Sequence, residues 1–345
     1  MFYHHDFITR LLKFFQEKPV LRKIQYRDAI NEALFEEMAR DERVFIMGIG
    51  VAKRGGSFGV TKGLLDAFGS ERVIDTPISE SSFTGMAIGA AIQGKRPIVE
   101  ITFIDFSTLA LDMMVNQAAK YHFITGGEER VPMVLRTQGG AGTGLGIQHS
   151  QSLEALFYHI PGLKIAIPST PYDAKGLLKK AIRDDDPVVF IEHKLLYDTL
   201  GEVPEKDYTI HFGIAEKRRK GTDCTIVGYS LMALKCVEAA DLLAGEGITC
   251  DVIDLRTLVP MDRESILTSV KKTGRLVVVA EAVQRGSVAS DIAAWAAENA
   301  FHELKSPVKR VSGRITPIPY NARLEKASIP DVEDIICAVK ALINE

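Results

Sequence analysis

Short apolar segments that alternate with amphipathic segments constrain the fold of this sequence most strongly. Val44–Gly48 is an apolar run closed by glycine, as expected for a buried parallel strand. Tyr26–Arg40, just before it, has apolar residues at helical spacing with charged residues between them, which predicts a surface helix. The same alternation continues almost to the C-terminus. It predicts an α/β fold with mostly parallel sheets covered by helices on both faces, which is a doubly wound arrangement.

The length of 345 residues is sufficient for two such domains. We expect an N-terminal extension at 1–23 containing a short amphipathic helix at 7–16, a larger domain at 24–200, a linker at 201–219 and a smaller α/β domain at 220–345. The linker is predicted because that stretch combines glycine, proline and mixed charge without steady periodicity. Its basic end, 216–220, is expected to be a solvated turn. In the larger domain, 107–121 is expected to form a helix.

Composition excludes several classes of protein. Lys and Arg number 42 against 45 Asp and Glu, so no strong field favours nucleic acid or an anionic membrane. No uncharged apolar run reaches the roughly 18 residues that span a bilayer. The four cysteines lack CxxC spacing and indicate buried thiols in a reducing compartment. The N-terminus lacks the features of a secretory signal. We therefore expect a soluble cytoplasmic protein, or a protein of the mitochondrial matrix if the source is eukaryotic.

Glu80 is the first candidate site residue. It follows a predicted strand at 72–75 and begins a segment that is nearly free of charge and contains Gly85 and Gly89. Such a segment predicts a closely buried helix with a carboxylate at its N-terminus, largely out of water. Two interpretations follow: an acid of the first turn stabilised by the helix dipole, or a carboxyl group with a chemical task.

Two further candidates follow strands. Phe106 comes after a strand predicted at 97–102, where an open α/β sheet binds ligands, so its ring is either part of the core or stacked on a flat ligand. Residues 139–146 hold five glycines in eight positions and end near His149. Their spacing satisfies neither the dinucleotide nor the phosphate-loop pattern. His149 is either a satisfied structural histidine or a proton donor and acceptor near neutral pH.

Taken in order, several longer motifs give these candidates a common meaning. The sequence resembles the β subunit of the thiamine-diphosphate-dependent decarboxylase component of 2-oxo acid dehydrogenase complexes, of the pyruvate and acetoin dehydrogenase type. The motifs are DTPISE at 75–80, QHSQS at 148–152, PSTPYDAKGLL at 168–178 and IDLRTL at 253–258. The resemblance implies a transketolase-like pyrimidine-binding domain followed by a smaller domain like the transketolase C-terminal domain.

The resemblance also implies roles. Glu80 would hydrogen-bond the N1′ atom of the cofactor's aminopyrimidine and act in catalysis, while Phe106 would pack on that ring with Ile78 beside it. His149 would serve proton transfer or orientation when an acyl group passes to a lipoyl arm. A structural potassium ion is implied at four residues: Met133 and Ala181 through their carbonyls, with Asp184 and Asp186.

The sequence contains no Gly-Asp-Gly, although the family binds the diphosphate and Mg²⁺ through a GDG…N motif. The resemblance therefore implies a separate α subunit that carries this motif, an α2β2 heterotetramer docked on a lipoyl-bearing acyltransferase, and no activity without the α subunit. The expected reaction is oxidative decarboxylation of a 2-oxo acid such as pyruvate. Acetoin or a branched-chain 2-oxo acid as substrate, a transketolase-like half enzyme, and a non-catalytic scaffold or regulatory chain remain alternatives.

One departure bears on these alternatives. The family commonly has acidic residues after its first strand, where this chain has Ile49 and Gly50. We expect the surroundings of the cofactor to differ here, which favours a specialised member of the family.

Overall fold

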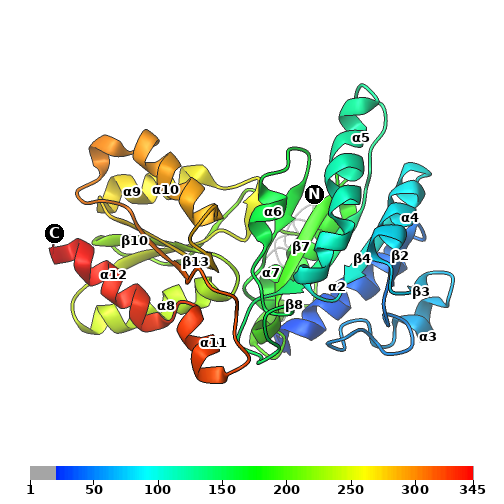
Figure 1. The fold of residues 1–345 in the computed structure, drawn as a ribbon, viewed down its shortest axis with the longest axis horizontal. Coiled ribbons are helices and arrows are strands. Elements are labelled where there is room, and N and C mark those ends of the chain that lie inside the picture. The colour runs from blue at the N-terminus through cyan, green and yellow to red at the C-terminus, as the bar shows by residue number, and fades with distance from the viewer. Residues whose placement is uncertain (1–20, 345) are drawn as a thin grey trace, which may run out of the picture.

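The computed structural model describes residues 21–344, which form two α/β units side by side (Figure 1). The helix predicted at 7–16 lies outside the described residues. Each unit is built on a twisted sheet with helices on both faces, so the predicted doubly wound α/β class is confirmed.

The first unit contains a seven-stranded sheet in the order β12-β6-β7-β5-β4-β2-β3. All neighbouring strands are parallel except β12, which runs antiparallel to β6. The bounds are β2 Val44–Gly48, β3 Val73–Asp75, β4 Arg96–Ile101, β5 Val134–Gly139, β6 Lys164–Ala166, β7 Val188–His193 and β12 Thr257–Val259.

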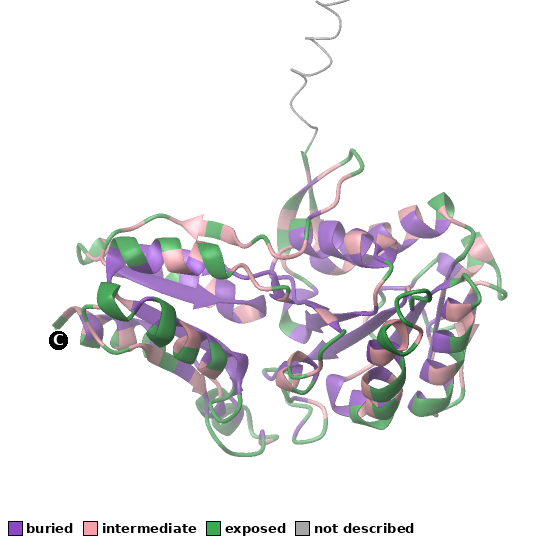
Figure 2. Cartoon of the chain, turned by 90° about the horizontal axis from the view of Figure 1, so that it is seen from above, coloured by how far each residue is buried: buried purple, intermediate pink, exposed green. Residues whose placement is uncertain are grey.

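Helices cover both faces of this sheet because adjacent strand residues point to opposite sides. Ile46 packs in the core beneath one set of helices, whereas Met47 packs in the core on the other side. The first set is α2 Tyr26–Arg40, α3 Leu64–Phe68 and α7 Pro171–Arg183; the second is α4 Glu80–Ile92, η1 Ile104–Ala110, η2 Met113–Ala118, α5 Ala119–Ile124 and α6 Glu154–Tyr158. Figure 2 shows the strands as the most continuously buried part of the chain.

The second unit contains a five-stranded sheet in the order β14-β13-β10-β11-β9. Its strands are β9 Glu216–Arg219, β10 Cys224–Gly228, β11 Cys250–Asp254, β13 Leu276–Val283 and β14 Lys309–Gly313; its helices are α8 Ser230–Gly245, α9 Arg263–Thr273, α10 Val288–Asn299, α11 Ala322–Ser328 and α12 Val332–Asn344, with a short turn η4 Phe301–Glu303. One apolar core runs without a break from this unit into the first, which joins the two units firmly.

The predicted linker is not a free connection. Its beginning is part of β8 Leu200–Pro204, which pairs antiparallel with β1 Leu21–Gln25, so the expected boundary of the N-terminal extension falls within a strand. Its end is β9, which pairs antiparallel with β11. The basic run 216–220 is therefore not a solvated turn: Arg218 makes ion pairs with Asp173 of α7 and Asp254 of β11 and links the two units.

Local helix geometry also departs from the sequence pattern. The helix predicted at 107–121 is instead a 3₁₀ segment (η1), a π segment (η2) and a short α-helix (α5) in succession. Such changes of winding alter the direction in which side chains point and are often found near functional sites.

The uncharged helix α4 begins at Glu80 as predicted, but it is not buried all round. Phe83, Ala87 and Ala91 pack in the core, whereas Met86 on the opposite face is 66% exposed. The face of α4 that carries Met86 therefore lacks charged residues although no other part of residues 21–344 buries it. Of the four cysteines, Cys337 is exposed on α12 and the other three are buried free thiols.

The largest fully buried side chain is that of Arg136, in the middle of β5. Its guanidinium group is paired with Glu100 on the neighbouring strand β4 and with Glu192 on β7, the neighbour on the other side. Glu192 also accepts a hydrogen bond of 2.5 Å from the hydroxyl group of Tyr197. This arrangement, the Arg136 cluster, connects three adjacent strands.

Replacing Arg136 by Met is expected to lower the free energy of unfolding by about 3–5 kcal/mol, because two carboxylates would remain buried without a counter-charge. The triple variant E100Q/R136M/E192Q is the matched control and should recover most of that loss. Urea unfolding of the purified chain measures both. If R136M alone unfolds at the wild-type urea concentration, the cluster does not stabilise the sheet.

Candidate functional site

A cleft of ≈ 570 Å³ opens at the carboxyl ends of β2, β3 and β4, where an open parallel sheet binds its ligands. It brings together three of the predicted site residues, Ile78, Glu80 and Phe106. The residues that line the cleft are Ile49, Arg54, Ser57, Phe58, Ile78, Glu80, Thr102, Phe103, Phe106, Leu109 and Leu145. The lining is mainly apolar and aromatic, with one acidic and one basic side chain.

Glu80 is placed by local structure. β3 ends at Asp75, whose carboxylate accepts hydrogen bonds from the backbone N–H groups of Ala52 and Lys53, and α4 begins at Glu80. Glu80 is 5% exposed, yet no other group among residues 21–344 hydrogen-bonds or ion-pairs with its carboxyl group. Glu80 lines the cleft, so its carboxyl group is available to hydrogen-bond a ligand there.

Aromatic rings form the wall next to Glu80. The ring of His149 makes edge-on contacts with Phe103 and Phe106, at centroid distances of 4.8 and 5.2 Å. The two phenylalanine rings are themselves 5.9 Å apart. His149, which follows the glycine loop, thus lies against the same ring that lines the cleft, and all the predicted catalytic and cofactor residues converge.

Lys194 holds the backbone beneath His149. Its ammonium group donates a hydrogen bond to the carbonyl oxygen of His149 and lies 5.4 Å from the centre of the Phe103 ring. Burial lowers the pKa of Lys194, although the carboxylates of Asp105 and Glu281 act in the opposite direction. Because Lys194 follows the end of β7, this contact connects the central sheet to the glycine loop.

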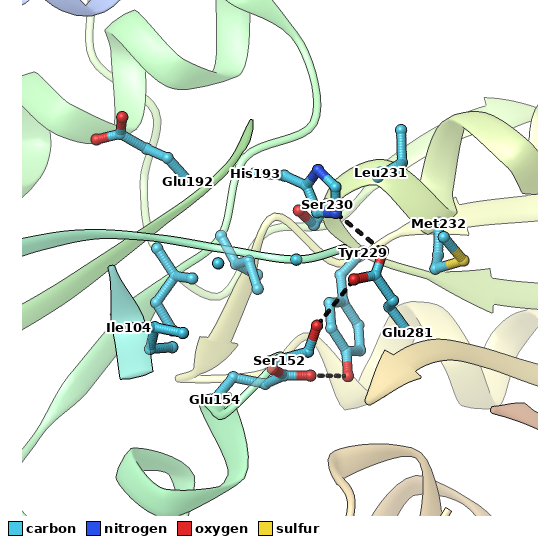
Figure 3. A pocket seen from close by; sticks show the side chains of 14 residues that line it. Ile104, Ser152, Glu154, Glu192, His193, Tyr229, Ser230, Leu231, Met232 and Glu281 are labelled. Carbon is cyan, nitrogen blue, oxygen red and sulfur yellow. Dashed lines mark hydrogen bonds and ion pairs between the residues drawn. The ribbon is translucent and has the colours of Figure 1, made fainter. Parts of the chain in front are cut away.

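A second, small cavity lies between the two units, behind the glycine loop (Figure 3). Its central group is the carboxylate of Glu281 on β13. That carboxylate accepts hydrogen bonds from the N–H of Ala141 at 2.7 Å and from the hydroxyl of Ser152 at 3.0 Å, and its other oxygen lies 2.9 Å from Nε2 of His193. The second unit therefore holds the start of the loop.

Tyr229 and Glu154 complete the wall of this cavity. The Tyr229 hydroxyl donates a hydrogen bond of 2.7 Å to the Glu154 carboxyl group, and both residues are buried. Burial raises the pKa of Glu154, with the Tyr229 hydrogen bond acting against it. This contact joins α6 of the first unit to the end of β10 in the second.

The predicted potassium residues lie in a different part of the first unit. Lys164 Nζ lies 2.6 Å from Oδ1 of Asp184 and 3.0 Å from Oδ2 of Asp186. The carbonyl oxygens of Met133 and Ala181 each accept one backbone hydrogen bond, which leaves each with a free lone pair. The carboxylates of Asp184 and Asp186 are both paired with the ammonium group of Lys164. A potassium ion at this place stays a prediction, and the carbonyl oxygens of Met133 and Ala181 are the groups left to bind it.

Sequence reasoning missed several residues of the site. Arg54 and Phe103 line the cleft, and Lys194 supports it from the turn after β7, almost fifty residues beyond the loop. Arg54 lies in an irregular loop with no periodic pattern, so nothing in the local sequence indicates where its side chain points. Ile49, noted for its departure from the family pattern, does line the cleft with Glu80.

Comparisons with known proteins agree with this geometry. The family model described as "Transketolase, pyrimidine binding domain" matches residues 22–199, and "Transketolase, C-terminal domain" matches residues 213–335. The β subunit of acetoin:2,6-dichlorophenolindophenol oxidoreductase from Cupriavidus necator is 49% identical over 92% of this chain and 97% of its own length. The chain belongs to the family of β subunits of 2-oxo acid dehydrogenase decarboxylase components.

Other β subunits of this family are similar over the same extent. The mitochondrial pyruvate dehydrogenase E1 component subunit beta of Dictyostelium discoideum is 44% identical over 92% of this chain and 91% of its own length. The 2-oxoisovalerate dehydrogenase subunit beta of Bacillus subtilis is 44% identical, over 92% of this chain and 98% of its own length. Membership implies thiamine diphosphate as cofactor and an α subunit as partner.

A solved structure supports the fold. The chain titled "Split gene transketolase, inactive beta4 tetramer" superimposes with a TM-score of 0.76, covering 93% of this chain and 98% of its own, at 24% identity. The two-unit architecture is therefore that of transketolase. Within residues 21–344, no helix is long and apolar enough to cross a membrane.

The contact between Glu281 and His193 predicts a pH dependence of stability. Burial alone would raise the pKa of Glu281, but the charge and hydrogen bond of His193, with the hydrogen bonds from Ala141 and Ser152, lower it below the ordinary value of 4.5. A lowered pKa stabilises the folded state above the ordinary value, and that stabilisation is lost as pH falls through the folded-state pKa.

We expect E281Q to be less stable than the wild type above pH 4.5, the ordinary pKa of a glutamate, and the difference to shrink as the pH falls below that value. Melting temperatures of the two proteins across this range measure the effect. A difference that stays constant with pH would mean that the carboxylate charge of Glu281 contributes nothing.

Proposed function

We propose that this chain is the β subunit of an enzyme that oxidatively decarboxylates a 2-oxo acid and transfers the acyl group to lipoamide. Thiamine diphosphate would lie between this chain and its α subunit. The observation that carries the proposal is Glu80, a buried residue whose carboxyl group has no partner within residues 21–344 and which lines an aromatic cleft at the carboxyl ends of parallel strands. An aminopyrimidine ring fits such a cleft, since it is flat and has a ring nitrogen that can share the carboxyl proton.

Each predicted residue has a role in this proposal. Glu80 holds a proton at the pyrimidine nitrogen N1′, Phe106 packs on the face of that ring, and Ile78 contacts its side. When bound, the cofactor supplies the electron sink that decarboxylation requires. The imidazole of His149, held against Phe103 and Phe106, gives or takes a proton as the acyl group passes to the lipoyl arm.

The cofactor's charged end belongs to the partner in this proposal. Among residues 21–344 there is no group of three or more His, Cys, Asp or Glu side chains placed to hold a metal ion. We therefore assign the diphosphate and Mg²⁺ to an α subunit with the GDG…N motif, in an α2β2 assembly docked on a lipoyl-bearing acyltransferase. Ile78, which is 82% exposed at the cleft, is a surface that such a partner would cover. We expect the complex in the cytoplasm, or in the mitochondrial matrix of a eukaryote.

The E80Q variant tests the proposal. Reconstituted with a cognate α subunit, thiamine diphosphate and Mg²⁺, it should reduce a dye in the presence of the 2-oxo acid about 10²–10⁴-fold more slowly than the wild type, because a group that transfers a proton is removed. The exposed Glu71, outside the cleft, provides the control variant E71Q, which should retain full activity.

A loss below about tenfold in E80Q would contradict the assigned role. If the wild-type complex binds no cofactor by calorimetry, the non-catalytic scaffold or regulatory alternative replaces the proposal. Product analysis without acyltransferase identifies a transketolase-like half enzyme by the new carbon–carbon bond in its product.

Acetoin is the second candidate substrate. It is favoured by the 49% identity to the β subunit of an acetoin:2,6-dichlorophenolindophenol oxidoreductase, against 44–45% for the β subunits named for pyruvate and 44% for the one named for 2-oxoisovalerate. The same dye assay with acetoin, pyruvate and a branched-chain 2-oxo acid in parallel separates the candidates, because kcat/KM ranks the substrates directly.

We propose that potassium, if bound, is held through the carbonyls of Met133 and Ala181. The chain should then melt at a higher temperature in potassium chloride than in choline chloride of equal ionic strength, because an ion that binds only the folded state stabilises it. The D186N variant should keep this difference, since its carboxylate is paired with Lys164. Equal melting temperatures in the two salts would exclude the site.

A further inference from the structure

The helix α11 in the second unit buries a charged residue instead of an apolar one. Most of its residues face solvent, and Leu324 is exposed, whereas Glu325 is 3% exposed. Glutamate is rarely buried without a partner. The contacts of Glu325 therefore explain why this short helix is held where it is.

Those contacts are with the glycine loop of the first unit. Oε1 of Glu325 accepts a hydrogen bond of 2.8 Å from the backbone N–H of Gly142, and Oε2 accepts one of 3.0 Å from the N–H of Gly144. Hydrogen bonds from N–H groups to a carboxylate are stronger than those between neutral groups. The donors that a phosphate would need in a glycine loop are thus bound by the chain's own carboxylate.

Tyr320 supplies a further contact from the same segment. A Cβ atom added to Gly146 would lie 2.4 Å from the Tyr320 ring, so the ring rests directly on that glycine. The carbonyl of Gly146 in turn accepts a hydrogen bond of 3.3 Å from the N–H of His149. The second unit therefore contacts the loop at Gly142, Gly144 and Gly146. The carbonyl of Gly146 also accepts the hydrogen bond that closes the turn leading to His149.

Two glutamates of the second unit hold different parts of the glycine loop. Glu281 holds Ala141 at the start of the loop, next to β5, whereas Glu325 holds the part that leads to His149. Leu145, which lies between the two parts anchored by Glu325 and Tyr320, lines the cleft with Glu80. Any displacement of residues 142–146 therefore changes both the cleft wall and the position of the imidazole.

We propose that Glu325 is a positioning residue for His149: by binding the N–H groups of Gly142 and Gly144, it makes the C-terminal domain part of the apparatus that orders the active-site loop. A loop with five glycines has many accessible conformations, and few of them place the imidazole against Phe103 and Phe106. The consequence for turnover rests on the function proposed above, whereas the ordering of the loop does not.

Hydrogen exchange on the full chain tests the ordering without any activity. In E325A, the amides of a peptide covering 140–151 should exchange about tenfold to a hundredfold faster than in the wild type, because two hydrogen bonds to a charged acceptor are lost. E298A is the matched control, since Glu298 is exposed on α10 of the same unit. Unchanged exchange in this peptide in E325A overturns the proposal.

Activity of the reconstituted α2β2 complex tests the connection to His149. A double-mutant cycle compares wild type, E325A, H149A and the double variant in lipoyl acylation. If Glu325 acts through His149, E325A lowers kcat in the wild-type background by about tenfold or more and has no further effect once His149 is absent. Effects that multiply in the double variant would contradict a positioning role.

E325Q keeps the proposal testable if E325A does not fold. Its amide replaces one carboxylate oxygen by an NH2 group that cannot accept a hydrogen bond, so exchange in 140–151 should still be faster than in the wild type, and the cycle is repeated with this variant. Faster exchange in 140–151 with no catalytic activity in the wild-type complex would contradict the proposed function alone. Normal wild-type activity with unchanged exchange in the variant would contradict the role of Glu325 alone.

Discussion

The Arg136 cluster is the interaction on which the rest of the first unit depends. It connects β4, β5 and β7, and each of these strands leads directly into a part of the site. β4 leads to Phe103 and Phe106, β5 to the glycine loop, and β7 to Lys194 beneath His149. A guanidinium group between two carboxylates adds charged hydrogen bonds between side chains of three strands whose spacing the backbone hydrogen bonds already set. The segments that meet at the cleft thus extend from strands that the Arg136 cluster links within the sheet.

Much of the fold could be predicted from the sequence, because the buried central strands are rich in apolar residues. Runs such as Val44–Gly48 are apolar on both faces, and this pattern needs no knowledge of the neighbouring strand. Edge strands lack such a signal. β9 is a basic segment whose pairing depends on β11, and Arg218 is accommodated only because Asp173 and Asp254 are brought to it by the fold. Contacts of this kind are decided by tertiary structure and have no local pattern.

The site residues also divide into those that a local sequence pattern indicates and those that only the fold brings together. Glu80, Phe106 and Ile78 lie directly after strands, so their common location follows from the rule that parallel strands end at one edge of a sheet. Lys194, Glu281 and Glu325 act on the loop from far along the chain, and their side chains are ordinary charged residues in the sequence. The spacing of the glycine loop differs from that of nucleotide-binding loops. The carboxylates of the second unit that accept hydrogen bonds from the loop have no counterpart in a local sequence pattern.

The strand β12 has a consequence for how such chains are divided. Residues Thr257–Val259 lie within the C-terminal family model, yet they complete the sheet of the first unit by pairing with β6. A chimaera joined between the two family models would therefore give the recipient sheet a foreign edge strand. Exchange of modules between relatives is constrained by three residues that belong to one module by sequence and to the other by structure.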